Sequence, residues 1–156
     1  MRTLIIATIC FVSSVTIALG QETTDTINYD AYPGMALYEI ETIKESFKEV
    51  DNPFIATYLG SEFHDYFYFP FMGANGIYYD FGDRNNDLGS IPFGEFDAPY
   101  PGYDAPENTS PGAKLVGEKF LIYWEFDLSY VICCEGGMDS YPAWLPRISK
   151  IEYYKD

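Results

Sequence analysis

The sequence has little of the chemistry on which most enzymes and transition-metal sites depend. It contains three cysteines and one histidine, His64, among its 156 residues. A lone histidine cannot supply a site built on several imidazoles, and the sequence shows no nucleophile-elbow serine, Walker loop, dinucleotide fingerprint or zinc motif. Its many carboxylates single out no glycosidase pair. We therefore expect a protein that is not an enzyme and has no cofactor apart from the calcium ion considered below.

Basic residues are also scarce. The chain has 9 Lys and Arg against 24 Asp and Glu, which gives a formal net charge of −15. Such a surface repels phosphate backbones and anionic lipid head groups, so it argues against nucleic acid and membrane surfaces as partners. It favours cations or a protein with a basic surface. The aromatic content of 19% argues against a disordered acidic chain, because such chains are poor in aromatic residues.

The cysteines cannot join distant segments of the chain. Cys10 lies in the apolar N-terminal run, and the other two, Cys133 and Cys134, are adjacent. Neighbouring Cα atoms lie about 3.8 Å apart, below the usual disulfide range of about 4.4 Å or more. Three arrangements stay open: two separate buried thiols, a strained bond between neighbours, or pairing with another chain. The spacing of a thioredoxin-type redox motif is absent.

The first 20 residues have the pattern of a secretory signal peptide. One basic residue, Arg2, precedes an apolar run that ends in small residues. For a membrane anchor, the alternative interpretation, this run is near the lower limit of length and is interrupted by polar residues. Cleavage before Gln21 predicts a secreted or periplasmic protein without a membrane segment.

The remaining chain has the length of one domain. Residues 21–34 predict a flexible lead-in, and residues 35–156 predict a single β-rich domain. Within it, residues 97–114 are rich in Pro and Gly and predict a long surface loop. This loop carries the glycosylation acceptor Asn108.

Alternating patterns predict the strands. Over residues 120–128 every even-numbered residue is apolar, whereas the odd-numbered ones become acidic halfway along. We expect the even-numbered side chains to face the core. Residues 148–154 alternate as well, with Pro146 at the strand start, where a missing N–H is tolerated. Shorter strands are predicted over 54–59 and 76–81, with a hairpin turn before the second.

One amphipathic helix is predicted over residues 35–50. Apolar residues recur there at intervals of four and three, and the sequence Asp51-Asn52-Pro53 ends the helix. So short a helix is not stable alone, and we expect its apolar stripe to pack on the sheet. The stripe consists of Ala36, Ile40, Ile43, Phe47 and Val50.

Residues 61–72 alternate strictly and predict a further strand with two different faces. The face expected in the core carries Phe63, Phe67, Phe69 and Phe71, together with Asp65. The face expected to meet water carries Glu62, His64, Tyr66 and Tyr68.

Residues 83–95 have the spacing of a calcium-binding loop. Asp83, Asn85 and Asp87 offer oxygen ligands, and Glu95 follows at the distal position if one inserted residue is allowed. No helix is predicted before the loop, a proline lies inside it and its glycine is displaced. Acidic turns give such spacings by chance, so a solvated turn is the interpretation that we favour.

The C-terminal part resembles a known type of domain. The segments 117–124, with the sequence GEKFLIYW, and 146–152, with the sequence PRISKIE, are similar to the closing strands of small exported bacterial β-barrel domains of the OB type. The resemblance implies no functional residues. Together with the patterns above, it predicts a mainly β fold, a small OB-like barrel or sandwich of about five strands, with one N-terminal amphipathic helix.

We expect this domain to act by binding. The preferred hypothesis is a protein-interaction or inhibitor-like module that presents Glu62, His64, Tyr66 and Tyr68 to a partner with a basic surface. The alternative is a carbohydrate-binding module in which tyrosines or Trp144 stack on a saccharide. A calcium-dependent structural protein that uses the loop at residues 83–95 is a third hypothesis.

Overall fold

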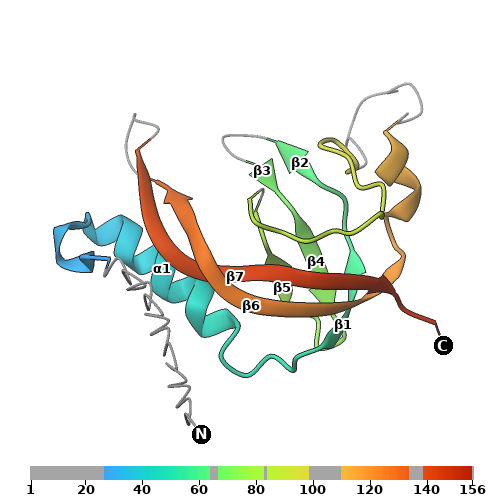
Figure 1. Cartoon of the computed structure of the whole chain (residues 1–156), viewed down its shortest axis with the longest axis horizontal. Helices are drawn as coiled ribbons and strands as arrows, with labels where there is room; N and C mark the ends of the chain where they lie inside the picture. The colour runs from blue at the N-terminus through green and yellow to red at the C-terminus, as the bar shows by residue number, and fades with distance from the viewer. Residues whose placement is uncertain (1–26, 64–66, 83, 99–109, 134–138, 156) are drawn as a thin grey trace, which may run out of the picture.

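The computed structural model describes residues 27–63, 67–82, 84–98, 110–133 and 139–155 (Figure 1). The fold is mainly β with one α-helix, as the sequence predicts. None of the helices in the described part of the chain is long and apolar enough to cross a membrane. The elements are η1 (Tyr29–Ala31), α1 (Gly34–Ser46), β1 (Phe54–Tyr58), β2 (Glu62–Phe63), β3 (Phe67–Tyr68), β4 (Pro70–Gly73), β5 (Tyr78–Asp80), η2 (Pro111–Leu115), β6 (Lys119–Ile132) and β7 (Ser140–Tyr153).

Two long antiparallel strands, β6 and β7, organise the sheet. They pair from Phe120 opposite Tyr153 to Ile132 opposite Ser140. Beyond β6 the sheet continues through β1, β4 and β5, in the order β5-β4-β1-β6-β7. β5 and β7 are its edges and do not pair with each other. The sheet is therefore open, which corrects the expectation of an OB-like barrel.

A β-bulge divides the β6–β7 ribbon into two halves. Tyr123 pairs with Lys150 and Trp124 pairs with Ile148, so Ser149 has no opposite residue. A bulge of this kind bends a strand and increases its twist. In Figure 1 the ribbon accordingly curves away from the rest of the sheet and passes over α1.

The two halves of the ribbon bury opposite faces. Phe120 and Ile122 are completely buried in the main core. Phe126 and Leu128 lie farther along the same face of β6 but are 43% and 38% exposed, whereas Val131 on the other face is buried. The prediction that all even-numbered residues face the core is therefore wrong for Phe126 and Leu128. Beyond the bulge, the twisted ribbon leaves the main core and packs its other face against α1.

Helix α1 connects the two cores. Ala36 and Ile40 pack with residues of the far half of the ribbon, and Phe47, just after the helix, lies in the main core. The predicted helix is confirmed, although it ends at Ser46. The main core is rich in aromatic residues in edge-to-face contact, which include Phe47, Phe54, Tyr58, Phe69, Phe71, Tyr79 and Phe81.

Residues 61–72 form a hairpin and a separate strand instead of the single strand that their alternation predicts. Strands β2 and β3 pair with each other, and β4 follows directly in the main sheet. Phe69 and Phe71 are buried as expected. Phe63 is 56% exposed, so its predicted place in the core is wrong. It belongs to the two-stranded hairpin, which lies outside the five-stranded sheet.

Strand β7 begins at Ser140, earlier than predicted, and contains two prolines. The main-chain groups of Ile148 bind Asp87 and Asn86 on the outer side of β7. These groups alternate between the two sides of a strand, so the nitrogens of Pro146 and Pro142 also point outward. At an edge strand no ladder hydrogen bond is lost there, and proline is tolerated.

The predicted surface loop at residues 97–114 is anchored at both ends. Asp97 is 1% exposed and accepts hydrogen bonds from the Tyr58 hydroxyl at 2.9 Å and the Gly94 N–H at 2.7 Å. The Ser110 hydroxyl donates to the same carboxylate. Residues 99–109, which include Asn108, lie outside the described residues, as does the predicted signal peptide.

Candidate functional site

The β2–β3 hairpin brings together two of the predicted partner-binding residues. Glu62 lies directly opposite Tyr68. Residues opposite each other in an antiparallel pair share one face, so the carboxylate and the phenol lie side by side. His64 and Tyr66, the other two residues predicted on this face, lie outside the described residues.

Strand β5 adds two residues to the same region. Tyr78 and Asp80 share the face of β5 opposite to Tyr79, which is buried in the core. Burial raises the pKa of Tyr78, and the neighbouring Asp80, Glu62 and Tyr68 raise it further. These effects require Asp80, Glu62 and Tyr68 each to lie within electrostatic reach of Tyr78. We call Glu62, Tyr68, Tyr78 and Asp80 the acidic face.

Asp80 is the most firmly held member of the acidic face. Its Oδ1 accepts hydrogen bonds from the N–H groups of Phe69 at 2.7 Å and Gly82 at 3.0 Å. Burial raises the pKa of Asp80, although both N–H groups and the nearby Arg147 act to lower it. The side chains of Asp80 and Arg147 also line a pocket of about 100 Å³.

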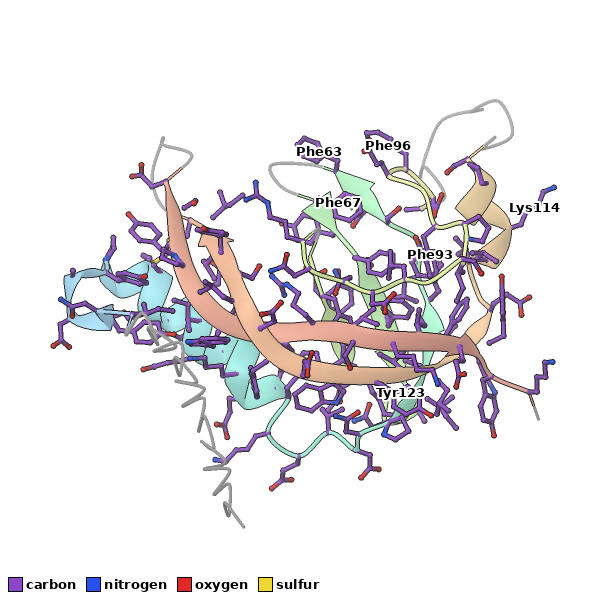
Figure 2. All side chains as sticks on the ribbon, in the orientation of Figure 1. Phe63, Phe67, Phe93, Phe96, Lys114 and Tyr123 are labelled. Atoms are coloured by element: carbon purple, nitrogen blue, oxygen red, sulfur yellow. The ribbon has the colours of Figure 1, made fainter. Side chains whose placement is uncertain are left out.

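Two exposed phenylalanines lie at the same end of the molecule. Phe63 is 56% exposed and Phe96 is 54% exposed. Figure 2 shows both rings projecting away from the sheet, beyond β2 and β3, whereas Phe93 points inward. Phe63 follows Glu62 directly and is paired with Phe67. Exposed aromatic rings next to charged groups are typical of protein-contact surfaces.

Trp144 belongs to another part of the fold. It is 44% exposed on β7 opposite Leu128, and its N–H donates to the Tyr29 hydroxyl at 3.4 Å. A groove of about 960 Å³ runs between α1 and β6. Its aromatic lining residues are Tyr38, Phe47, Trp124 and Phe126, and its polar ones include Glu41, Thr42 and Glu45. Tyr38, Trp124 and Phe126 offer rings for stacking in this groove, and the predicted Trp144 is not among its lining residues.

Two of the four predicted calcium ligands form hydrogen bonds with the protein itself. The Asn85 side chain donates to the Leu128 carbonyl at 2.7 Å, and Asp87 Oδ1 accepts from the Gly89 N–H at 3.0 Å. Glu95 is exposed, and Asp83 lies outside the described residues. Within those residues, no three His, Cys, Asp or Glu side chains are grouped so that they could hold a metal ion.

Cys133 is 6% exposed and forms a disulfide. This bond excludes a free thiol at Cys133, and with it the first of the three predicted arrangements, two separate thiols. Its neighbour Cys134 lies outside the described residues.

Sequence reasoning missed Tyr78 and Asp80 as members of the acidic face. The alternation of Tyr78 and Asp80 with buried Tyr79 and Phe81 was a signal that could have placed them on the exposed side of a strand. Their proximity to Glu62 depends on how the hairpin sits beside β5, which no local pattern records. No family model, curated protein or solved structure matches the chain.

Proposed function

We propose that the protein is a secreted or periplasmic, non-enzymatic binding module that uses the acidic face to hold a partner protein with a basic surface. The observation that carries the proposal is the convergence of Glu62, Tyr68, Tyr78 and Asp80 from two separate parts of the chain. Carboxylates steer a lysine- or arginine-rich surface toward this face, and the phenols offer large contact areas with few rotatable bonds.

The surroundings of the acidic face support the proposal. The chain as a whole carries a formal net charge of −15, and Phe63, on the other face of the same hairpin, gives an exposed apolar contact at this end of the molecule. The long-range charge attracts a basic partner, whereas the hydrogen-bonded Asp80 and the paired Glu62 and Tyr68 determine where it binds.

The test is a binding experiment with variants of equal net charge. Purified wild type is immobilised, and basic proteins are recovered from the native compartment at low salt. Glu62→Lys is expected to weaken the binding of a captured partner by about tenfold, because it replaces attraction by repulsion at the centre of the face. Glu118→Lys, an equal charge change at an exposed residue outside the acidic face, serves as the control and is expected to bind as wild type.

Two further variants test the phenols. Tyr68→Phe and Tyr78→Phe keep the rings and remove the hydroxyl groups, and each is expected to weaken binding by a few-fold. Background recovery with wild type, or equal losses in Glu62→Lys and Glu118→Lys, would contradict the proposal. Equal losses would mean that only the net charge matters.

The groove between α1 and β6 favours a saccharide as the second candidate ligand. It places aromatic rings next to carboxylates and a hydroxyl group, the combination that holds the apolar face and the polar rim of a sugar. Tyr38 is 70% exposed there. A glycan array tests this candidate: Tyr38→Ala should abolish any signal that wild type gives, and a blank array for wild type removes the candidate.

A further inference from the structure

One stretch of the β7 edge is open, whereas the edge from Pro142 to Ile148 is covered. From Pro142 to Ile148 each outward-facing residue has a main-chain group in a hydrogen bond. The Tyr32 hydroxyl donates to the Pro142 carbonyl, the Trp144 N–H donates to Tyr29, and Arg147 donates to the Pro146 carbonyl. Ile148 bonds to Asn86 and Asp87.

The open stretch begins directly after Ile148. The main-chain N–H and C=O groups of Phe120 and Ile122 in β6 point toward β1. The residues opposite them in β7 are Tyr153 and Ile151, and their main-chain groups therefore point away from the sheet. The hydrogen bond from the Tyr154 N–H to the Lys119 carbonyl, at 3.0 Å, agrees with this alternation. No described residue bonds to the outward main-chain groups of Ile151 and Tyr153.

The open stretch lies in a groove that could admit another strand. A space of about 750 Å³ adjoins it, between the 150–155 segment and the 87–91 loop. Leu121 and Glu152 line it from one face of the ribbon, and Ile151 and Tyr153 line it from the other. Unpaired N–H and C=O groups at such an edge are a template for strand addition.

We propose that this edge pairs with the same edge of a second copy of the chain, antiparallel and centred on Ile151. The open stretch comprises residues 149–153, and Ile151 is its central residue. In this pairing residue 149 of one copy faces residue 153 of the other, so the added strand stops short of the covered Ile148. In this register Lys150 faces Glu152 of the second copy, and Glu152 faces its Lys150. Opposite charges placed directly across a strand pair stabilise it.

The charge order also selects this register over its neighbour. A slip of two residues, which moves the centre of the pair from Ile151 to Glu152, would place the two Glu152 side chains directly opposite each other, and like charges at such positions destabilise the pair. Lys150 and Glu152 already form an ion pair within one chain, at 3.0 Å, with both side chains about half exposed. In the dimer each would gain the partner's opposite charge as a second neighbour.

The test is a charge-reversal series measured by sedimentation equilibrium of the purified protein. The salt concentration is kept at about 0.15 M, so that the overall repulsion between two acidic chains is screened beyond about 8 Å. Wild type is expected to be in a monomer–dimer equilibrium. Lys150→Glu and Glu152→Lys should each weaken it by about tenfold or more, because two attractive contacts become repulsive.

Two arms separate the proposal from damage to the fold. The double variant K150E/E152K restores opposite charges across the pair and should dimerise as wild type does. An equal mixture of the two single variants should form a heterodimer more tightly than either variant pairs with itself. Dimerisation that neither single reversal weakens overturns the proposal. A wild type that stays monomeric also overturns it and leaves the edge to an extended segment of another protein.

Discussion

Removal of one buried hydroxyl should destabilise the protein strongly. The Tyr58 hydroxyl accepts the Ser61 N–H at 2.7 Å and donates to Asp97 Oδ2 at 2.9 Å. All three residues are at most 1% exposed, so water cannot replace these bonds without a rearrangement. A buried donor left unsatisfied costs about 1–3 kcal/mol, and loss of a hydrogen bond to a carboxylate costs a similar amount. Tyr58→Phe should therefore lower the free energy of unfolding by about 3 kcal/mol.

Urea titration followed by far-UV circular dichroism measures this loss. The midpoint should fall with an unchanged slope, because the variant exposes the same surface on unfolding. Tyr38→Phe, at a ring that is 70% exposed, is the control and should match wild type. A free energy of unfolding for Tyr58→Phe within about 0.5 kcal/mol of the control would refute the assignment of Asp97 as an anchor of the loop.

The same variant has a second signature at alkaline pH. Burial raises the pKa of Tyr58, and Asp97 raises it further, while Ser61 acts to lower it. A phenol whose pKa is higher in the folded state contributes stability below its unfolded pKa of about 10 and loses that contribution as the pH rises further. Wild-type stability should accordingly fall above about pH 10, and Tyr58→Phe should make that fall shallower.

Three further results are expected. In urea titrations Phe120→Ala should lower the free energy of unfolding by about 3–5 kcal/mol, and Phe126→Ala should lower it by about 1 kcal/mol or less. The Phe120 ring is buried, whereas the Phe126 ring, on the same face of β6, is 43% exposed. Equal losses would contradict the division into two cores. Because the pKa of Asp80 is raised in the folded state, the free energy of unfolding of wild type should decline as the pH rises from about 4. Asp80→Asn should flatten this decline in acid titrations, and an unchanged dependence of stability on pH would argue against a desolvated carboxylate. If the β7-edge dimer and the acidic face both act, dissociation from a surface coated with a basic partner should be slower for wild type than for Lys150→Glu, and K150E/E152K should restore the slow rate.

Local patterns predicted those elements whose environment is uniform along their length. The apolar stripe of α1 and the alternation of β1 and β5 each correspond to one buried face, so periodicity located them. The same reasoning failed for Phe126, because a bulge and the twist of the ribbon change which face is buried. It failed for Phe63 as well, because its alternating segment folds back into a hairpin without a proline or glycine to mark the turn.

The site was predictable to the extent that it lies on one strand pair. Alternation placed Glu62 and Tyr68 on one face, and the register of β2 and β3 puts them opposite each other. Tyr78 and Asp80 join them only through the position of β5, a tertiary contact. The prolines of β7 show the same limit, since Pro142 and Pro146 are strand breakers unless the strand lies at an edge.

The two edges of the sheet are protected in different ways, and the difference bears on how the protein associates. β5 is three residues long, and the Asp80 carboxylate at its end bonds to neighbouring N–H groups; a short edge strand with an inward-held charge resists the addition of further strands. Along β7, tyrosines, prolines and the 86–87 segment occupy the edge as far as Ile148. The five residues left open carry Lys150 and Glu152 in alternation, so a strand with the wrong charge order meets repulsion. Charges that oppose indiscriminate aggregation at this edge thus also define the one self-pairing register that it accepts.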